Sequence, residues 1–162
     1  MTNASFDDDS VPPPPEPAEE EPRRSFRRQE EPKRYGEFRQ PPADREAEQG
    51  VLGAMLLSPN TVMEVIEELE PDDFYYPAHQ LIYQAMIDLY AAGTDIDAVI
   101  VNSRLDRYNN LERVGGAPYL HTLLATVPTA ANARYYAEIV AEKAVLRKLV
   151  DAGTRVVQLG FE

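Results

Sequence analysis

Among the residue types that carry catalytic or metal chemistry, histidine and cysteine are scarce in this 162-residue chain. There are two histidines, His79 and His121, and no cysteine, which excludes disulfides and thiolate chemistry. No serine, histidine and carboxylate fall into an arrangement typical of nucleophilic catalysis. His79 lies in an apolar helical pattern, where a packed, hydrogen-bonded imidazole is the simpler interpretation and a metal ligand or general base is the alternative. We therefore expect no catalytic residue in this set.

Two acidic pairs, Asp72-Asp73 and Asp95-x-Asp97, have the residue type of cation ligands. Their flanks have the pattern of helix starts, so helix capping is the favoured role. The phosphate-binding pattern G-x-x-x-x-G-K-[ST] is absent, because Gly115-Gly116 are not followed by a lysine and a hydroxyl residue. We expect no metal site, no nucleotide cofactor site and no ATP hydrolysis in this chain.

Helical periodicity extends over the sequence from Asp44 onward. Proline, glycine and capping residues divide it into segments, and the last segment contains no proline between residues 130 and 160. The segment 98–101, with the sequence AVIV, has strand propensity, but no neighbouring stretch offers a strand to pair with it. The pattern therefore predicts an all-α protein with helices over roughly 44–57, 59–69, 77–92, 98–107, 116–127 and 130–160.

The last predicted helix is the most informative element. About thirty residues at 1.5 Å per residue give a helix of roughly 45 Å, which exceeds the diameter of a small domain. Apolar residues follow one side of it: Ile139, Leu146 and Gly153 are seven residues apart, and Leu149 and Val156 lie between them. A helix longer than its own domain cannot bury such an apolar stripe within that domain, so the stripe favours packing against a partner helix.

Residues 1–42 form a tail of different composition. They contain nine of the 14 prolines, and the acidic stretch 1–22 precedes the basic stretch 23–39 with its three interleaved aromatic residues. Too little apolar area is available to offset the entropy cost of ordering, so we predict a disordered tail. The alternative is an arm in which residues 23–39 bind single-stranded nucleic acid through stacking and phosphate contacts.

The net charge restricts the ligands of the chain. The formal net charge is −12 at pH 7 and the isoelectric point is about 4.6, which argues against a general nucleic-acid-binding surface on the body. No apolar run approaches the length of a membrane span, and the acidic, proline-rich N-terminus differs from a signal peptide. We expect a cytoplasmic protein.

Several motifs, in order along the chain, resemble one known family. They are EAEQ-x-VLGAMLL, PDDFY, AHQLIYQAM, VGG-x-x-YL, VPTAAN and YYA-x-IV-x-EK. Together they resemble the N-terminal domain of the DnaB-type replicative DNA helicases over roughly residues 44–162. The resemblance implies a globular helical head over 43–112 and an antiparallel helical hairpin over 113–162. It also implies a separate C-terminal RecA-like motor that binds ATP and Mg²⁺ and unwinds DNA as an ATP-dependent DNA helicase.

The resemblance further implies partners. In this family, hairpins pair protomers into dimers, three dimers build a collar on a hexameric ring that acts on DNA, and the collar receives the C-terminal domain of a DnaG-type primase. We expect oligomer contacts on one set of residues: Tyr136, Ile139, Leu146, Leu149 and Val157. We expect primase contacts on a second set: Tyr119, Leu123, Val150 and Val156. Two alternatives stay open: a stand-alone helical adaptor, and a Tyr119 that only packs the head against the hairpin.

Overall fold

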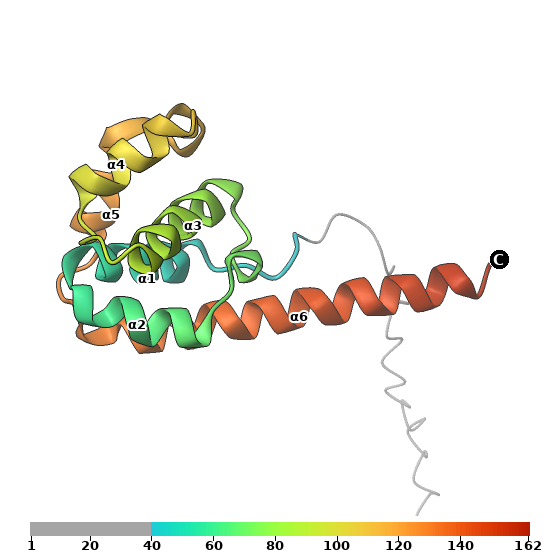
Figure 1. Ribbon diagram of the computed structural model, residues 1–162. Helices are drawn as coiled ribbons and strands as arrows, with labels where there is room; N and C mark the ends of the chain where they lie inside the picture. Colours follow the sequence, from blue (N-terminus) through green and yellow to red (C-terminus); the bar gives the residue numbers. More distant parts are fainter. Residues whose placement is uncertain (1–39) are drawn as a thin grey trace, which may run out of the picture. The chain divides into compact units, whose positions relative to one another are not determined.

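In the computed structural model, which describes residues 40–162, every regular element is a helix (Figure 1). This confirms the all-α class, and the segment 98–101 is helical as predicted. The predictions for residues 1–39, including the basic stretch, lie outside the described residues. The α-helices are α1 (Arg45–Leu57), α2 (Pro59–Glu68), α3 (Pro77–Ala91), α4 (Ala98–Arg107), α5 (Gly116–Thr126) and α6 (Ala133–Leu159). Three short 3-10 turns join them: η1 (Pro71–Asp73), η2 (Glu112–Val114) and η3 (Ala130–Asn132).

Acidic side chains begin two of these helices. The Asp44 carboxylate accepts the N–H of Ala47 at 2.9 Å at the start of α1. The Asp97 carboxylate accepts the N–H groups of Val99 and Ile100, both at 2.8 Å, at the start of α4. These bonds satisfy N–H groups that have no partner within the helix. The capping role predicted for Asp97 is thereby confirmed.

The core is built around α1, whose residues 51–56 are all buried. Helices α2, α3, α5 and α6 all contact it. Two glycines allow close approach: a Cβ on Gly53 would lie 2.3 Å from the carbonyl oxygen of Leu123, and one on Gly50 would lie 2.8 Å from the ring of Tyr136. Both glycines therefore serve close packing of α1 against α5 and α6.

The expected hairpin needs correction in the placement of α5. This helix packs against α1 and α4 and does not run along α6 as the second arm of a hairpin. Gly115 and Gly116 adopt φ angles of 100° and 74°, which residues with a side chain rarely adopt. After this turn α5 lies across α1, where Leu120 and Leu123 are buried. The core therefore continues past residue 112, where the sequence predicts that the head ends.

The helix α6 is continuous over 27 residues, as its proline-free sequence predicts. Its beginning contacts α1 and α2, and Figure 1 shows it passing along α2 and continuing beyond it. We use "head" for α1 to α5 together with residues 133–147, and "distal α6" for residues 148–159. Among residues 40–162, no helix is both long enough and apolar enough to cross a membrane.

Candidate functional site

The first half of α6 is held on the head by a narrow row of small side chains. This inner row consists of Ala133, Ala137, Val140 and Ala144, which are all buried. Spacings of four, three and four residues keep the row on one side of the helix. Because three of the four side chains are methyl groups, the α6 backbone lies close to its neighbours α1 and α2.

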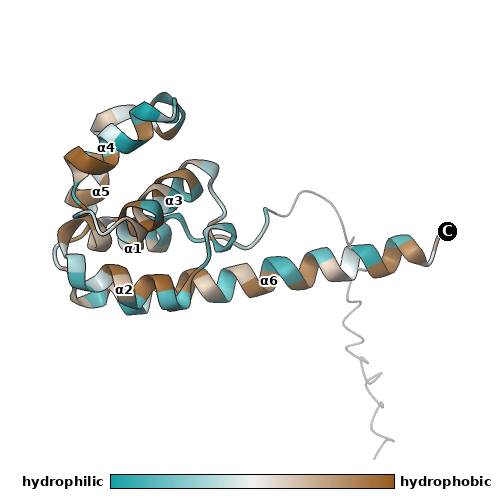
Figure 2. Cartoon of the chain, in the orientation of Figure 1, coloured by the Kyte–Doolittle hydropathy of each residue, from teal (hydrophilic) through white to brown (hydrophobic). Residues whose placement is uncertain are grey.

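A second apolar row follows the opposite side of α6 and is exposed. This outer row consists of Tyr135, Leu146, Leu149, Gly153 and Val157. At about 100° per residue, these positions share one side of the helix and point away from the inner row. Leu149 is 67% exposed, and Figure 2 shows apolar bands that continue along α6. Several large apolar side chains in one exposed row are typical of an interaction surface.

Beyond residue 147, the inward side of α6 becomes polar. Its side chains there are Lys148, Asp151, Arg155 and Gln158, and every residue from 148 to 162 is exposed. Within residues 40–162, distal α6 is therefore an amphipathic helix whose apolar side no other element covers, and only its first residue, Lys148, contacts the head. The outer row is the side that another helix would cover.

The five residues predicted as oligomer contacts divide into two groups. Leu146, Leu149 and Val157 are exposed in the outer row. Tyr136 and Ile139 are half-buried and pack against the core of the head. These two side chains hold α6 on its own head, so we keep the interface prediction for the first three residues.

The four residues predicted as primase contacts also divide. Val150 and Val156 are exposed on distal α6 and flank the outer row. Leu123 is 0% exposed and lies against α1, so its assignment to a partner surface is wrong. Periodicity identified the apolar side of α5 but not the helix that covers it. Tyr119 is half-buried, and its hydroxyl is bonded inside the head.

Beneath Tyr119 lies a buried polar chain that sequence reasoning did not find. The Glu48 carboxylate is 1% exposed and accepts the N–H of Tyr75 at 2.7 Å. His79 Nδ1 lies 2.6 Å from a Glu48 oxygen, and His79 Nε2 lies 2.6 Å from the hydroxyl of Tyr119. Gln49 donates to the same hydroxyl at 3.1 Å. The prediction of a packed, hydrogen-bonded His79 is confirmed.

The chemistry of this polar chain is that of a brace. A carboxylate only accepts, so His79 donates from Nδ1 to Glu48, and its Nε2 is hydrogen-bonded to the Tyr119 hydroxyl. The order of carboxylate, imidazole and hydroxyl resembles a catalytic relay, but the hydroxyl is already engaged by both Gln49 and His79. In the described part of the chain, no three potential metal ligands gather. The polar chain therefore ties α1, α3 and α5 together.

A second polar cluster lies where α6 leaves the head. Arg147 donates to the carbonyl oxygens of Pro42, at 2.7 Å, and of Asp73. Its guanidinium also lies 5.6 Å from the centroid of the Tyr75 ring, in cation–π geometry. Lys148 Nζ lies 2.9 Å from an Asp73 carboxylate oxygen. These contacts anchor α6 to the η1 turn and to the segment that precedes α1.

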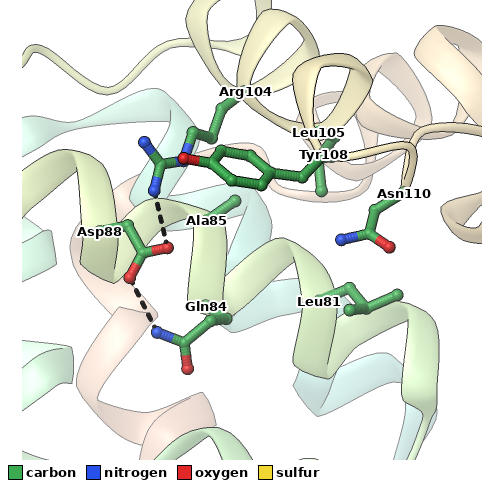
Figure 3. Close-up of a pocket in the computed structure, with 8 residues that line it drawn as sticks. All are labelled: Leu81, Gln84, Ala85, Asp88, Arg104, Leu105, Tyr108 and Asn110. Carbon is green, nitrogen blue, oxygen red and sulfur yellow. Dashed lines mark hydrogen bonds and ion pairs between the residues drawn. The ribbon is translucent and has the colours of Figure 1, made fainter.

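A cavity of about 160 Å³ opens between α3 and α4 (Figure 3). Arg104 lies over the ring of Tyr108, 4.5 Å from its centroid, and donates to Asp88 at 3.0 Å. Gln84 donates to the other Asp88 oxygen at 2.9 Å. Because Asp88 neutralises Arg104, the lining of the cavity offers little net charge to a ligand. We therefore assign no ligand to this cavity.

Fold and surface together define a class: an all-α head from which a long helix presents an uncovered apolar row. Residues 40–142 match the DnaB-like helicase N terminal domain, and the chain belongs to this family. Its structure is similar to the crystal structure of the N-terminal domain of DnaB helicase from Mycobacterium tuberculosis, with a TM-score of 0.74 and 64% sequence identity. That match covers 75% of this chain and 87% of the other. The resemblance inferred from the motifs is confirmed.

Full-length relatives are replicative helicases. The chain is 63% identical over 123 residues to the replicative DNA helicase DnaB of Mycobacterium leprae, which covers 76% of this chain and 20% of that protein. It is 48% identical over 123 residues to the replicative DNA helicase DnaC of Bacillus subtilis, with 76% and 27% covered. A structure described as a DnaB-like replicative helicase and its interactions with primase matches with a TM-score of 0.64 and 29% identity. It covers 71% of this chain and 27% of that one.

Proposed function

We propose that this chain forms the N-terminal collar of a replicative DNA helicase, where it pairs protomers and receives a primase. Its membership of the DnaB N-terminal family and its identity to replicative helicases support the first part. The description of a similar helicase together with primase supports the second. Since the chain spans 20% and 27% of the relatives above, we assign DNA unwinding, ATP and Mg²⁺ to the parent protein.

The exposed outer row is the observation that carries the proposal. Burying a large aliphatic side chain contributes about 1.5–3 kcal/mol, so Leu146, Leu149 and Val157 together favour association strongly. The spacing of positions 146, 149 and 153 is that of a helix–helix seam. In a two-fold pair, one row serves both chains. Three such pairs would build the collar of a hexamer.

We propose that the primase contacts the flanks of this row. Val150 and Val156 lie on opposite flanks and are exposed, so a primase domain can contact them beside a helix pair. Tyr119 would contribute its half-exposed ring, while its hydroxyl remains bonded to His79. A site that is apolar with polar neighbours suits a partner that must bind and leave.

Light scattering combined with primase binding tests both parts on the same variants. Leu146→Glu should convert oligomers into monomers, because it places an unpaired charge in the seam. Val156→Glu should leave the oligomers intact and weaken binding of the primase C-terminal domain. Gln158→Glu, on the polar side of distal α6, is the matched control and should change neither.

The results that would contradict the proposal are distinct for each part. If the Leu146→Glu chain stays assembled, α6 is not the interface between protomers. If Val150→Glu and Val156→Glu both bind primase as the unmodified chain does, the primase surface lies elsewhere.

We also propose that this chain alone does not hydrolyse ATP, because it has no phosphate-binding loop. A coupled phosphate-release assay on the purified chain should give no turnover. Turnover that disappears when a residue of this chain is substituted would overturn this expectation.

A further inference from the structure

The two polar clusters of the head meet at the turn formed by residues 70–76. The first cluster reaches this turn through Glu48, which accepts the N–H of Tyr75 at 2.7 Å and lies 3.4 Å from the N–H of Tyr76. The second reaches it through Arg147, which donates to the Asp73 carbonyl and lies over the Tyr75 ring. The turn formed by residues 70–76 is thus hydrogen-bonded to Glu48 of α1 and to Arg147 of α6.

The contacts form an unbroken path across the head. It runs from the Tyr119 hydroxyl on α5 to His79 on α3, and from there to Glu48 on α1. It continues through the backbone and ring of Tyr75 to Arg147 on α6. Apart from the covalent step within Tyr75, each step joins segments that are distant in sequence.

Burial makes the middle of this path rigid. His79 and Glu48 are both 1% exposed, so neither can exchange a lost partner for water. A change at one hydrogen bond must then be absorbed by its neighbours in the path. The two ends, in contrast, are accessible: Tyr119 is half-buried, and Arg147 lies where α6 leaves the head.

We propose that this path, which we call the polar relay, couples the α5 surface around Tyr119 to the direction in which α6 leaves the head. Arg147 is then a positioning residue for distal α6, and Tyr119 is the accessible end through which a bound protein shifts it. The inference deepens the proposed function, on which its biological role rests, but the coupling itself is a property of the chain alone.

Distance measurement between two spin labels tests the coupling without any partner. The chain contains no cysteine, so Glu67→Cys on α2 and Gln158→Cys on distal α6 give unique labelling sites, and both positions are exposed. Labelled chain is diluted with unlabelled chain so that distances within one chain are recorded. Arg147→Met should broaden or shift the distance distribution, because α6 loses its anchor. Tyr119→Phe, which removes only a hydroxyl at the far end, should change the distribution in the same direction.

Two control variants separate the relay from general loosening. Tyr108→Phe removes an exposed tyrosine hydroxyl outside the relay. Thr61→Val removes a buried hydroxyl that bonds to the Ala54 and Ser58 carbonyls. Both should leave the distance distribution unchanged, even where Thr61→Val lowers the stability of the head.

The double variant Tyr119→Phe with Arg147→Met decides the matter. If the relay exists, the double variant should change the distribution no more than Arg147→Met alone, because the path is already broken. Three outcomes overturn the proposal. They are an unchanged distribution in Tyr119→Phe, additive changes in the double variant, and a change in Thr61→Val as large as that in Tyr119→Phe. Each of these outcomes can occur whether or not α6 pairs protomers, so it leaves the proposed function standing.

Discussion

The two halves of α6 share one backbone but differ in what holds them. In the first half, the inner row of three alanines and Val140 is buried against α1 and α2. In distal α6, all residues are exposed, and the outer row lies on the opposite side of the helix. The contrast shows that one helix can present two different sides: small side chains fix it to its own head, and large apolar side chains stay uncovered.

The largest expected effect comes from breaking the inner row. Ala137→Glu would bury an unpaired carboxylate at a position that is 0% exposed, and such charges cost roughly 3–5 kcal/mol. We expect the head to unfold at a much lower urea concentration, as followed by circular dichroism. Ala152→Glu places the same side chain on an exposed position of distal α6 and serves as the control. Equal urea midpoints for the two variants would show that the inner row does not hold the helix.

The second-largest effect is expected when a glutamate is placed in the outer row instead of the inner row. Leu149→Glu should leave the urea midpoint of the head unchanged, since Leu149 has no cover within the described chain. It should weaken association by at least about 2 kcal/mol, or roughly thirty-fold in the dissociation constant, as for a central interface residue. Analytical ultracentrifugation over a concentration series measures this. If Leu149→Glu lowers the stability of the head and leaves association unchanged, the outer row holds the head together and is not an interface.

Periodicity predicted the helices of this fold but not their neighbours. The caps at Asp44 and Asp97 and the uninterrupted α6 follow directly from residue types and spacing. Leu123 has the same helical spacing whether α1 or a partner covers it, so the sequence could not place it. The same ambiguity applies to Tyr136, which is half-buried and packs on α1 while part of its side chain stays exposed.

The polar contacts were harder to predict than the apolar ones. Glu48 lies near the start of α1, where an acidic residue is expected for its effect on the helix dipole. The available signal was its spacing, because Glu48 precedes Val51, Leu52 and Met55 by three, four and seven residues and so shares their buried side. Its partners come from α3 and from the segment between η1 and α3, and only the folded chain brings these together.

A smaller effect is expected where α5 is tied to the head. Tyr119→Phe removes the hydroxyl between His79 and Gln49 and leaves a buried imidazole nitrogen without a partner. The cost should be about 1–3 kcal/mol in the free energy of unfolding, measured by urea titration. Tyr108→Phe, just after the end of α4 and 55% exposed, should stay within about 0.5 kcal/mol. If the two variants have the same stability, Tyr119 does not brace the head.

The smallest effect, and the one that sharpens the comparison most, is expected at Gly153. A Cβ at this position would meet no atom of the chain within 4 Å, so nothing inside the protein requires a glycine there. In a free helix, Gly153→Ala should therefore raise helix stability by about 1 kcal/mol. Gly153 also lies within the outer row. In the helix pair that we propose, a methyl group there would meet the partner helix. We expect the variant to show more helix by circular dichroism at dilution and weaker association by ultracentrifugation. The control is Ala152→Gly, one residue away and outside the outer row. It should lower helicity, and it should weaken association only by as much as the loss of helix explains. Stronger association in Gly153→Ala would mean that the partner does not approach this part of α6 and that the seam is confined to the Leu146–Leu149 turn.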